Sequence, residues 1–251
     1  MVNCHNGESF LKETISSILN QTYKNWELIF WDNFSTDLSE KIVKSFKDSR
    51  IKYFKSNSFT SLYKARNLAI NKCSGQYISF LDTDDMWISD KLEKQINFME
   101  KNPNYEIIYT NYYVLTKNKK YVKYTSELSS GQITQKLLDN YSIGINTAFL
   151  NKSVFDHYNF EKDLNIICDF DLFIKASQKF EIGYLKDPLT IYRVHENSYT
   201  AKNLKMYIHE LTNWIKKNEI DLKNKNYVLT KLKFYIIKLR IKHLFRSLKL
   251  L

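Results

Sequence analysis

Three carboxylates stand within four positions of one another at the end of an apolar run. The segment is ISFLDTDDMW (78–87), in which Asp82, Asp84 and Asp85 follow residues fit for a buried strand. Like charges this close repel one another, and burying them is costly unless something pairs with them. Mg²⁺ and Mn²⁺ prefer carboxylate oxygens and often complete their shell with phosphate oxygens. The cluster predicts a site for a metal and a diphosphate; the alternative is that one aspartate caps the next helix while the others stay solvated.

Two further clusters carry residue types that could join the same chemistry. CDFDLF (168–173) places Asp169 and Asp171 at the expected start of a helix, where negative charge is favoured with or without a site. YRVHEN (192–197) brings Arg193 and His195 together, although a single histidine is more often structural. Each of these two clusters by itself is compatible with a functional site or with ordinary structure.

The apolar spacing alternates between helical and strand periods through the first 115 residues. It predicts helices at 8–20, 35–46, 61–75, a stretch through Leu92 and Met99 that ends near Pro103, and 170–181. It predicts strands at 26–31, 50–54, 77–81, 105–115 and 184–195, with loops and short strands or turns at 116–150. Strands that alternate with helices imply crossover connections and a largely parallel sheet.

Ligands of such sheets bind beyond the carboxyl ends of the strands. DTDD (82–85) and DNFSTD (32–37) each follow the end of an expected strand. We therefore expect both clusters at the same edge of the sheet.

The composition excludes several classes of protein. Only five glycines occur in 251 residues, and neither a G-x-G-x-x-G nor a G-x-x-x-x-G-K-[ST] motif is present, which argues against a dinucleotide site and a P-loop. The three cysteines are widely spaced, which fits a reducing compartment such as the cytoplasm better than a disulfide framework or a zinc site. The sequence contains no run of 18 apolar residues, the length that a membrane-spanning helix needs.

The positive charge is concentrated at the end of the chain. Residues 201–251 hold 13 Lys/Arg and 3 Asp/Glu, a net of +10, whereas residues 1–200 carry a net of only +1. This distribution argues against nucleic acid as a partner of the main body.

Residues 226–251 have the pattern of a basic amphipathic helix. An apolar face is expected from Phe234, Ile237, Ile241, Leu244, Phe245 and Leu248, and an opposite basic face from Lys231, Lys238, Lys242, Arg246 and Lys249. The helix either packs on the body with a solvated basic face or lies on an anionic membrane surface, and the two are compatible if its end is free.

Five motifs in order resemble the family 2 inverting glycosyltransferases. They are NCHNGESFLKETISSILNQTYKNWELIFWDNFSTD, KARN, GQYISFLDTDDMW, CDFDLF and YRVHENS, and together they span about residues 1–200. The resemblance implies an α/β GT-A fold, a Rossmann-like, mostly parallel open sheet flanked by helices. It implies a nucleotide-sugar-binding half at 1–110, an acceptor half at 111–200, and a helical extension at 201–251.

The resemblance also implies the ligands and the reaction. The donor would be a nucleotide-diphospho-sugar, the cofactor Mn²⁺ or Mg²⁺, and the acceptor a hydroxyl of a glycan or lipid-linked molecule. We expect a role in bacterial cell-surface polysaccharide synthesis, in the cytoplasm or peripherally on the inner face of the cytoplasmic membrane. The rival hypotheses are a non-catalytic sugar-nucleotide or glycan-binding module on a decayed scaffold, and a nucleic-acid or membrane-surface binder driven by the basic tail.

Individual roles follow from matching positions. Asp169 matches the catalytic base, and Asp85 matches the metal-binding aspartate. Asp84 matches the carboxylate at the ribose or in the metal shell, with Asp82 as support, and His195 matches a residue that faces the diphosphate and the metal.

The donor side is implied in the same way. Asn3 matches a residue after the first strand that touches the base, Asp32 and Asn33 match the acidic pair that recognises it, and Arg66 matches a donor-side basic residue.

The sequence departs from the family in three places. Only Met1–Val2 precede the NCHNGE motif, so we expect a truncated first strand or a start further upstream. The usual Asp-Asp-Gly is Asp32-Asn33-Phe34, which leaves the preferred base open because Asn offers both a donor and an acceptor. The usual Glu-Asp is Cys168-Asp169, which removes one carboxylate but keeps the aspartate that matches the catalytic base.

Overall fold

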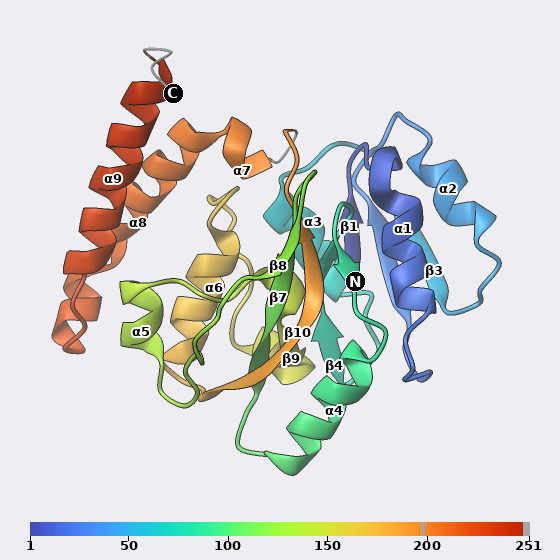
Figure 1. The fold of residues 1–251 in the computed structure, drawn as a ribbon, viewed down its shortest axis with the longest axis horizontal. Coiled ribbons are helices and arrows are strands. Elements are labelled where there is room, and N and C mark those ends of the chain that lie inside the picture. Colours follow the sequence, from blue (N-terminus) through green and yellow to red (C-terminus); the bar gives the residue numbers. More distant parts are fainter. Residues whose placement is uncertain (197–198, 248–251) are drawn as a thin grey trace.

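The computed structural model describes residues 1–196 and 199–247, and a parallel sheet forms its first half. The strand order is β3 (Ile51–Lys55), β2 (Leu28–Asp32), β1 (Val2–Cys4) and β5 (Leu81–Asp82). Helices α1 (Glu8–Leu19), α2 (Ser39–Ser45) and α3 (Leu62–Ile70) follow strands β1, β2 and β3 in turn. Figure 1 shows α1 and α2 side by side, on the side of the molecule away from the C-terminus. The predicted alternation of strands and helices is confirmed, and the boundaries of these elements differ from the expected ones by at most five residues.

The first strand is short, and it is central. Val2 is fully buried and pairs with Phe30 on one side and Leu81 on the other. Asn3, expected after this strand, lies within it, between Trp31 and Asp82. Three residues are enough to form β1 because both of its neighbours supply hydrogen bonds.

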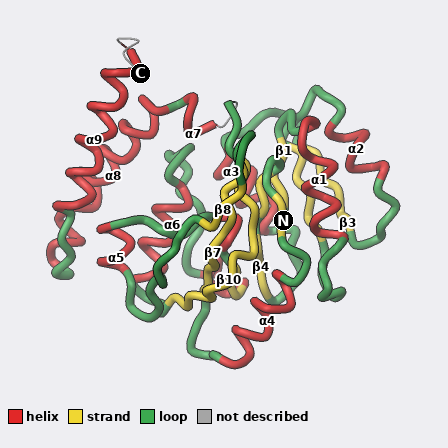
Figure 2. The backbone as a smooth tube through the Cα atoms, in the orientation of Figure 1, coloured by secondary structure: helices red, strands yellow, loops and turns green. Residues whose placement is uncertain are grey.

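A second, six-stranded mixed sheet carries the other half. Its order is β4 (Tyr77–Ser79), β9 (Phe149–Asn151), β7 (Ile107–Leu115), β10 (Ile182–Arg193) and β6 (Met86–Trp87), with β8 (Lys120–Val122) paired to β7. In Figure 2 the strands gather in the middle of the molecule, with helices on both sides.

The predicted strand 77–81 divides between the two sheets. Ile78 in β4 pairs antiparallel with Leu150, whereas Leu81 in β5 pairs parallel with Val2. The buried Phe80 lies between the two strands. The apolar run is therefore buried as expected, and it joins the two sheets rather than forming one strand.

Short helices connect the second sheet. They are α4 (Lys91–Lys101), α5 (Thr134–Asp139), the 3₁₀ turns η1 (Ile145–Thr147) and η2 (Lys152–Asp156), and α6 (Cys168–Ser177). Helix α6 begins two residues before the predicted start at 170, so Asp169 and Asp171 both lie in its first turn.

Three helices end the described chain: α7 (Tyr199–Lys202), α8 (Leu204–Asn224) and α9 (Thr230–Ser247). Leu211, Trp214 and Ile215 of α8 are buried in the main hydrophobic core, together with residues of α6. The expected extension is thus packed into the body, and Figure 1 shows α8 and α9 side by side. No helix within 1–196 and 199–247 is long and apolar enough to cross a membrane.

Helix α9 uses a different face against the body from the one we expected to be its apolar stripe. Leu232, Ile236 and Leu239 are buried. The expected stripe is exposed at Phe234, Ile237, Ile241, Leu244 and Phe245, each between 43% and 57% accessible. Leu248 and Lys249 lie outside the described residues.

The expected separation of the basic and apolar faces is wrong for Lys238. Its Nζ lies 4.8 Å from the centre of the Phe234 ring, because residues four apart share a face of a helix.

Candidate active site

The predicted clusters meet at the carboxyl edge of the parallel sheet. Cys4 pairs with Asp32 and Asn3 pairs with Asp82, so β2, β1 and β5 end side by side. The loop after β5 is held against α1, where the Thr14 hydroxyl lies 2.8 Å from the Thr83 carbonyl oxygen and 2.9 Å from that of Asp85. The expectation of one shared edge is confirmed.

Gly7 lets the two loops of this edge approach. A Cβ at this position would lie 3.0 Å from both the Cys4 Sγ and the Thr83 Cβ, so that these neighbours would have to shift by a few tenths of an ångström. The glycine therefore sets how tightly the first loop covers the aspartates.

Asp84 and His195 form the open part of the acidic cluster. Their Oδ2 and Nε2 atoms are 2.7 Å apart, and both side chains stay partly exposed. Arg193 orients this pair, because its Nε donates to the Asp84 carbonyl oxygen over 3.0 Å while an Nη donates to Glu13 over 2.6 Å. The pair therefore lies at a partly exposed place on this edge.

Asp85 occupies the closed part of the cluster. Its side chain is 1% exposed, and it accepts hydrogen bonds from the Arg193 backbone N–H (2.9 Å) and from the Asn146 side chain. Burial, with added repulsion from Asp82 and Asp84, raises its pKa well above the usual range. Each oxygen of Asp85 thus accepts one hydrogen bond, and burial limits its access to a ligand. Asn146 was not predicted from the sequence, because no motif marks it.

The described residues contain no cluster of three or more His, Cys, Asp or Glu side chains arranged to hold a metal ion. A Mg²⁺ or Mn²⁺ ion bound with a nucleotide needs only one or two protein ligands, since phosphate oxygens and water supply the rest. Asp84 offers one such carboxylate, and it is hydrogen-bonded to His195.

Arg66 joins the acidic cluster to the expected base. Its guanidinium is buried, with one Nη 3.3 Å from the Asp82 carboxylate and the other 3.4 Å from the Cys168 Sγ. Asp169 follows at the start of α6, and its Oδ1 accepts the N–H of Phe170 over 2.8 Å. The surrounding protein desolvates Asp169 and raises its pKa, while the nearby Arg66 charge opposes this.

A cavity of about 340 Å³ lies beside this edge. Its lining includes Asn3, His5, Asn33, Phe59 and Thr60. The Asn3 Nδ2 is buried and has no hydrogen-bond partner within the structure, which marks it as a donor for a ligand. His5 and Phe59, which the sequence analysis missed, place their rings 4.5 Å apart at this cavity.

Asn33 lines this cavity, and Asp32 precedes it at the end of β2. Asp32 is fully buried and accepts from the Tyr53 hydroxyl (2.6 Å) and the Ser35 N–H (2.7 Å). The Asn33 side chain donates to the Thr60 carbonyl oxygen (2.7 Å) and accepts from the Thr60 hydroxyl (2.8 Å). The side chains of Asp32 and Asn33 are thus both hydrogen-bonded within the protein. Their predicted role in binding the nucleotide base stays a prediction.

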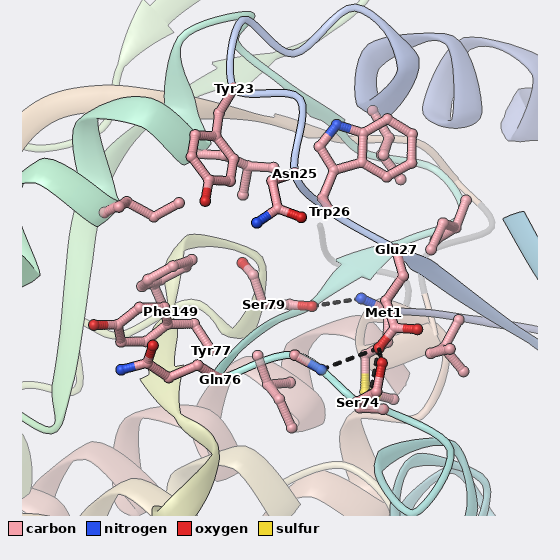
Figure 3. Close-up of a pocket in the computed structure, with 18 of the residues that line it drawn as sticks. Met1, Tyr23, Asn25, Trp26, Glu27, Ser74, Gln76, Tyr77, Ser79 and Phe149 are labelled. Atoms are coloured by element: carbon pink, nitrogen blue, oxygen red, sulfur yellow. Dashed lines mark hydrogen bonds between the residues drawn. The ribbon is translucent and has the colours of Figure 1, made fainter. Parts of the chain in front are cut away.

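A larger cavity of about 420 Å³ lies at the opposite edge of the sheet, where β2 and β4 begin. Figure 3 shows Met1, Trp26, Glu27, Ser74 and Tyr77 around it. None of the predicted site residues lines this cavity. The volume of a cavity therefore does not identify the candidate active site.

Comparison with known proteins agrees with this geometry. Residues 1–158 match the family described as glycosyl transferase family 2. The Escherichia coli UDP-Glc:alpha-D-GlcNAc-diphosphoundecaprenol beta-1,3-glucosyltransferase WfaP is 32% identical over 250 residues, which cover 98% of this chain and 94% of that protein. WfgD of Escherichia coli, with the same named activity, is 40% identical over 157 residues, or 62% of this chain and 60% of that one.

Solved structures share the fold. TarS 1–349 of S. aureus in complex with UDP-GlcNAc superposes with a TM-score of 0.68 at 16% identity, over 85% of this chain and 65% of that one. PcManGT from Pyrobaculum calidifontis, a mannosyltransferase in complex with GDP-Man and Mn²⁺, gives 0.63 at 14% identity, over 87% and 63%. The chain spans less than two thirds of the length of WfgD and of both solved chains.

The predicted GT-A fold is confirmed by these likenesses. Asp169 and His195 lie beyond the matched residues 1–158, so their positions rest on the geometry above. Since the family match covers more than half of the chain, and WfaP is similar over almost its whole length, the chain belongs to glycosyl transferase family 2.

Proposed function

We propose that this protein is a metal-dependent inverting glycosyltransferase that moves a sugar from a nucleotide-diphospho-sugar to a hydroxyl of a lipid-linked glycan. The observation that carries the proposal is the bridge formed by Arg66, which links the acidic strand end at Asp82 to the start of α6 at Asp169. This contact supports the proposal that Asp169 acts next to the donor, because Arg66 contacts both Asp82 and Cys168, the residue before Asp169.

The donor is proposed to be a UDP-sugar held in the 340 Å³ cavity. The unpartnered Asn3 Nδ2 offers a hydrogen bond to a carbonyl of the base, and the His5 and Phe59 rings offer apolar contact. The names of WfgD and WfaP specify UDP-Glc, and TarS has been solved with UDP-GlcNAc. These names also specify a GlcNAc-diphosphoundecaprenol acceptor, from which we propose a lipid-linked acceptor here.

A Mn²⁺ or Mg²⁺ ion is proposed to be held by Asp84 and His195. When bound, such an ion offsets negative charge on the departing nucleotide diphosphate. PcManGT, a neighbour in fold, has been solved with Mn²⁺. Asp85 as a ligand stays a prediction, since its side chain is 1% exposed and hydrogen-bonded to Asn146 and to the Arg193 N–H.

Asp169 is proposed to accept the proton of the acceptor hydroxyl. As the acceptor oxygen bonds to the anomeric carbon, the bond from that carbon to the diphosphate oxygen breaks on the opposite face, and the nucleotide leaves with the electron pair. One in-line displacement inverts the configuration, so a single base suffices. The raised pKa of Asp169 suits this task, because a less acidic carboxyl is a stronger base.

A thermal-shift and turnover assay tests the proposal. UDP-glucose and UDP-GlcNAc are added with and without Mn²⁺, and release of UDP is followed with a GlcNAc-diphosphoryl lipid. We expect a Mn²⁺-dependent rise in Tm and UDP release, because binding to the native state stabilises it. Asp84→Asn should lose the Mn²⁺-dependent part, whereas Asp139→Asn, which changes a surface carboxylate paired with Lys231, should retain it.

The outcomes separate the rival functions. A donor-induced shift with no UDP release would favour the non-catalytic binding module. No shift and no release with any donor would contradict the proposal, and salt-sensitive RNA binding would favour the nucleic-acid alternative.

We also propose that α9 rests on an anionic membrane surface at the cytoplasmic face. Its exposed stripe, including Phe234, Ile237 and Ile241, faces away from the packed residues Leu232 and Ile236. Lysines beside this stripe can reach lipid head groups.

Liposome co-sedimentation tests this surface with point variants, because α8 and α9 contribute to the core and their removal would disturb the fold. Glutamate at both Ile237 and Ile241 should release the protein from phosphatidylglycerol vesicles. Glutamate at Ile220, an exposed apolar residue of α8, should not. Equal binding of all three proteins would remove the docking hypothesis.

A further inference from the structure

Helix α8 reaches the start of α6 with a buried carboxylate. Glu210 is 6% exposed, and its two oxygens accept the backbone N–H groups of Asn165 (2.9 Å), Ile166 (2.9 Å) and Ile167 (3.2 Å). These three residues lead directly into α6, whose N-cap residue Ile167 provides no side-chain cap. A carboxylate 43 or more residues away in the sequence thus binds the three backbone N–H groups that lead into α6, the last of which belongs to the N-cap residue.

One turn further along α8, Trp214 makes a second connection. Its Nε1 donates to the Asp171 Oδ1 over 2.7 Å, and its ring packs edge-on against Phe170, with the ring centres 4.8 Å apart. Asp171 is 1% exposed and also accepts from Lys175 over 2.8 Å. Residues four apart share a face of a helix, so Glu210 and Trp214 act on α6 from the same side.

Asp169 lies between these two attachment points. Glu210 holds the backbone at 165–167, and Trp214 holds Phe170 and Asp171, while Arg66 approaches Cys168 from α3. The carboxylate of Asp171 is thus used for structure, and that of Asp169 is left for the site. A helix start clamped on both sides of one residue restricts where that side chain can point.

We infer that Glu210 is a positioning residue for the base, acting through the loop 165–167 and assisted by Trp214. This inference rests on the proposed function for its catalytic meaning. It also gives α8 a defined role, since α8 lies outside the residues that match the family.

Glu210→Gln is the informative variant. Glutamine keeps the size of the side chain but replaces one accepting oxygen by an NH₂ group, which faces backbone N–H donors. Glu219→Gln is the matched control on the same helix, because Glu219 binds Lys223 and Lys233 rather than the α6 loop. Trp214→Phe removes the hydrogen bond to Asp171 and keeps an aromatic ring against Phe170.

Turnover is the first readout. We expect kcat to fall about 10- to 100-fold in Glu210→Gln, the range in which a small misplacement of a reacting group acts, with donor affinity unchanged. Trp214→Phe should give a smaller loss, and Glu219→Gln should match the wild type. Unchanged kcat in Glu210→Gln would overturn the inference, and so would a parallel loss of donor binding.

Two readouts do not depend on activity. Hydrogen exchange of a peptide that covers 165–170 should accelerate in Glu210→Gln and not in Glu219→Gln. The pKa of Asp169, followed by carboxyl ¹³C NMR, should change only in Glu210→Gln. If the wild type releases no UDP, the proposed function fails, while these two measurements still decide whether Glu210 sets the position of Asp169. Unchanged exchange and titration would refute the positioning role.

Discussion

The pKa of a carboxylate at the starting edge of the parallel sheet, Glu27, shifts in the opposite direction from the pKa values of Asp85 and Asp169 at the carboxyl edge. At the starting edge, burial raises the pKa of Glu27, but hydrogen bonds from Lys52, Ser74 and Gly75 outweigh it and lower the pKa to about 2. At the carboxyl edge, burial and neighbouring carboxylates raise the pKa of Asp85, and burial raises that of Asp169. The charged form of Glu27 is thus stabilised, whereas the charged forms of Asp85 and Asp169 are destabilised.

This difference identifies the site better than cavity volume does. The cavity at the starting edge is larger, and the Glu27 carboxylate beside it is fully satisfied by hydrogen bonds and an ion pair. At the carboxyl edge, burial and neighbouring carboxylates raise the pKa of Asp85. Buried donors without a partner do not distinguish the edges, because Asn3 Nδ2 lies at one cavity and Trp26 Nε1 and Trp87 Nε1 lie at the other. Perturbed pKa values are concentrated at functional sites, which is why we expect the site at the carboxyl edge.

The largest expected effect is on transfer by Asp169→Asn. Loss of the base should lower kcat by about 10²–10⁴-fold with donor affinity retained, measured by UDP release and by calorimetric titration of the donor. Glu27→Gln at the other edge should change kcat little below its melting temperature. Near-normal turnover in Asp169→Asn would remove Asp169 from the mechanism.

The next effect is an opposite dependence of stability on pH at the two edges. The folded-state pKa of Asp169 lies above its unfolded value, so its contribution to stability falls as pH rises from about 4 toward neutrality. The folded-state pKa of Glu27 lies below its unfolded value, so its contribution is present at neutral pH and is lost as pH falls toward about 2.

Scanning calorimetry against pH checks this pair of signs. Asp169→Asn should melt higher than the wild type at pH 7, by roughly 2–4 °C, with the gap closing toward pH 4. Glu27→Gln should melt lower at pH 7, by roughly 2 °C, with the gap closing in acid. Shifts of the same sign in both variants would contradict the contrast between the edges.

The smallest effect concerns Phe34, at the carboxyl edge after β2. Its φ of 67° lies in the left-handed region that favours glycine, and its side chain is 42% exposed. Phe34→Gly should therefore stabilise the protein by about 0.5–1 kcal/mol, after the greater chain entropy of unfolded glycine is counted. Phe34→Ala keeps the unfavourable backbone and should give no such gain in a urea melt; equal gains would exclude a backbone cause.

Much of the fold could be predicted because apolar periodicity reports burial directly. The helix at 8–20 was predicted within a residue, since Leu11, Ile15 and Ile18 all turn inward. The run at 77–81 was predicted as one strand because periodicity detects burial and not pairing partners. Its division between β4 and β5 depends on Leu150 and Val2, which lie far from it in the sequence.

The site could be predicted in part for a similar reason. The type and order of Asp82, Asp84 and Asp85 predicted an acidic strand end. Which of them is open to a ligand depends on Asn146 and Arg193, which close Asp85 and leave Asp84 beside His195. A carboxylate's neighbours in space, rather than its neighbours in the chain, decide its exposure and charge.

The sequence by itself determined the alternating α/β order, the acidic end of the strand at 77–82 and the start of a helix near Asp169. These depend on local spacing and on residue type, which the chain carries at every position. Only the tertiary structure decided that Arg66 bridges Asp82 and the start of α6, and that Glu210 of α8 binds the backbone of the loop before Asp169. Those contacts join residues far apart in the chain, and burial against a common core is what brings them together.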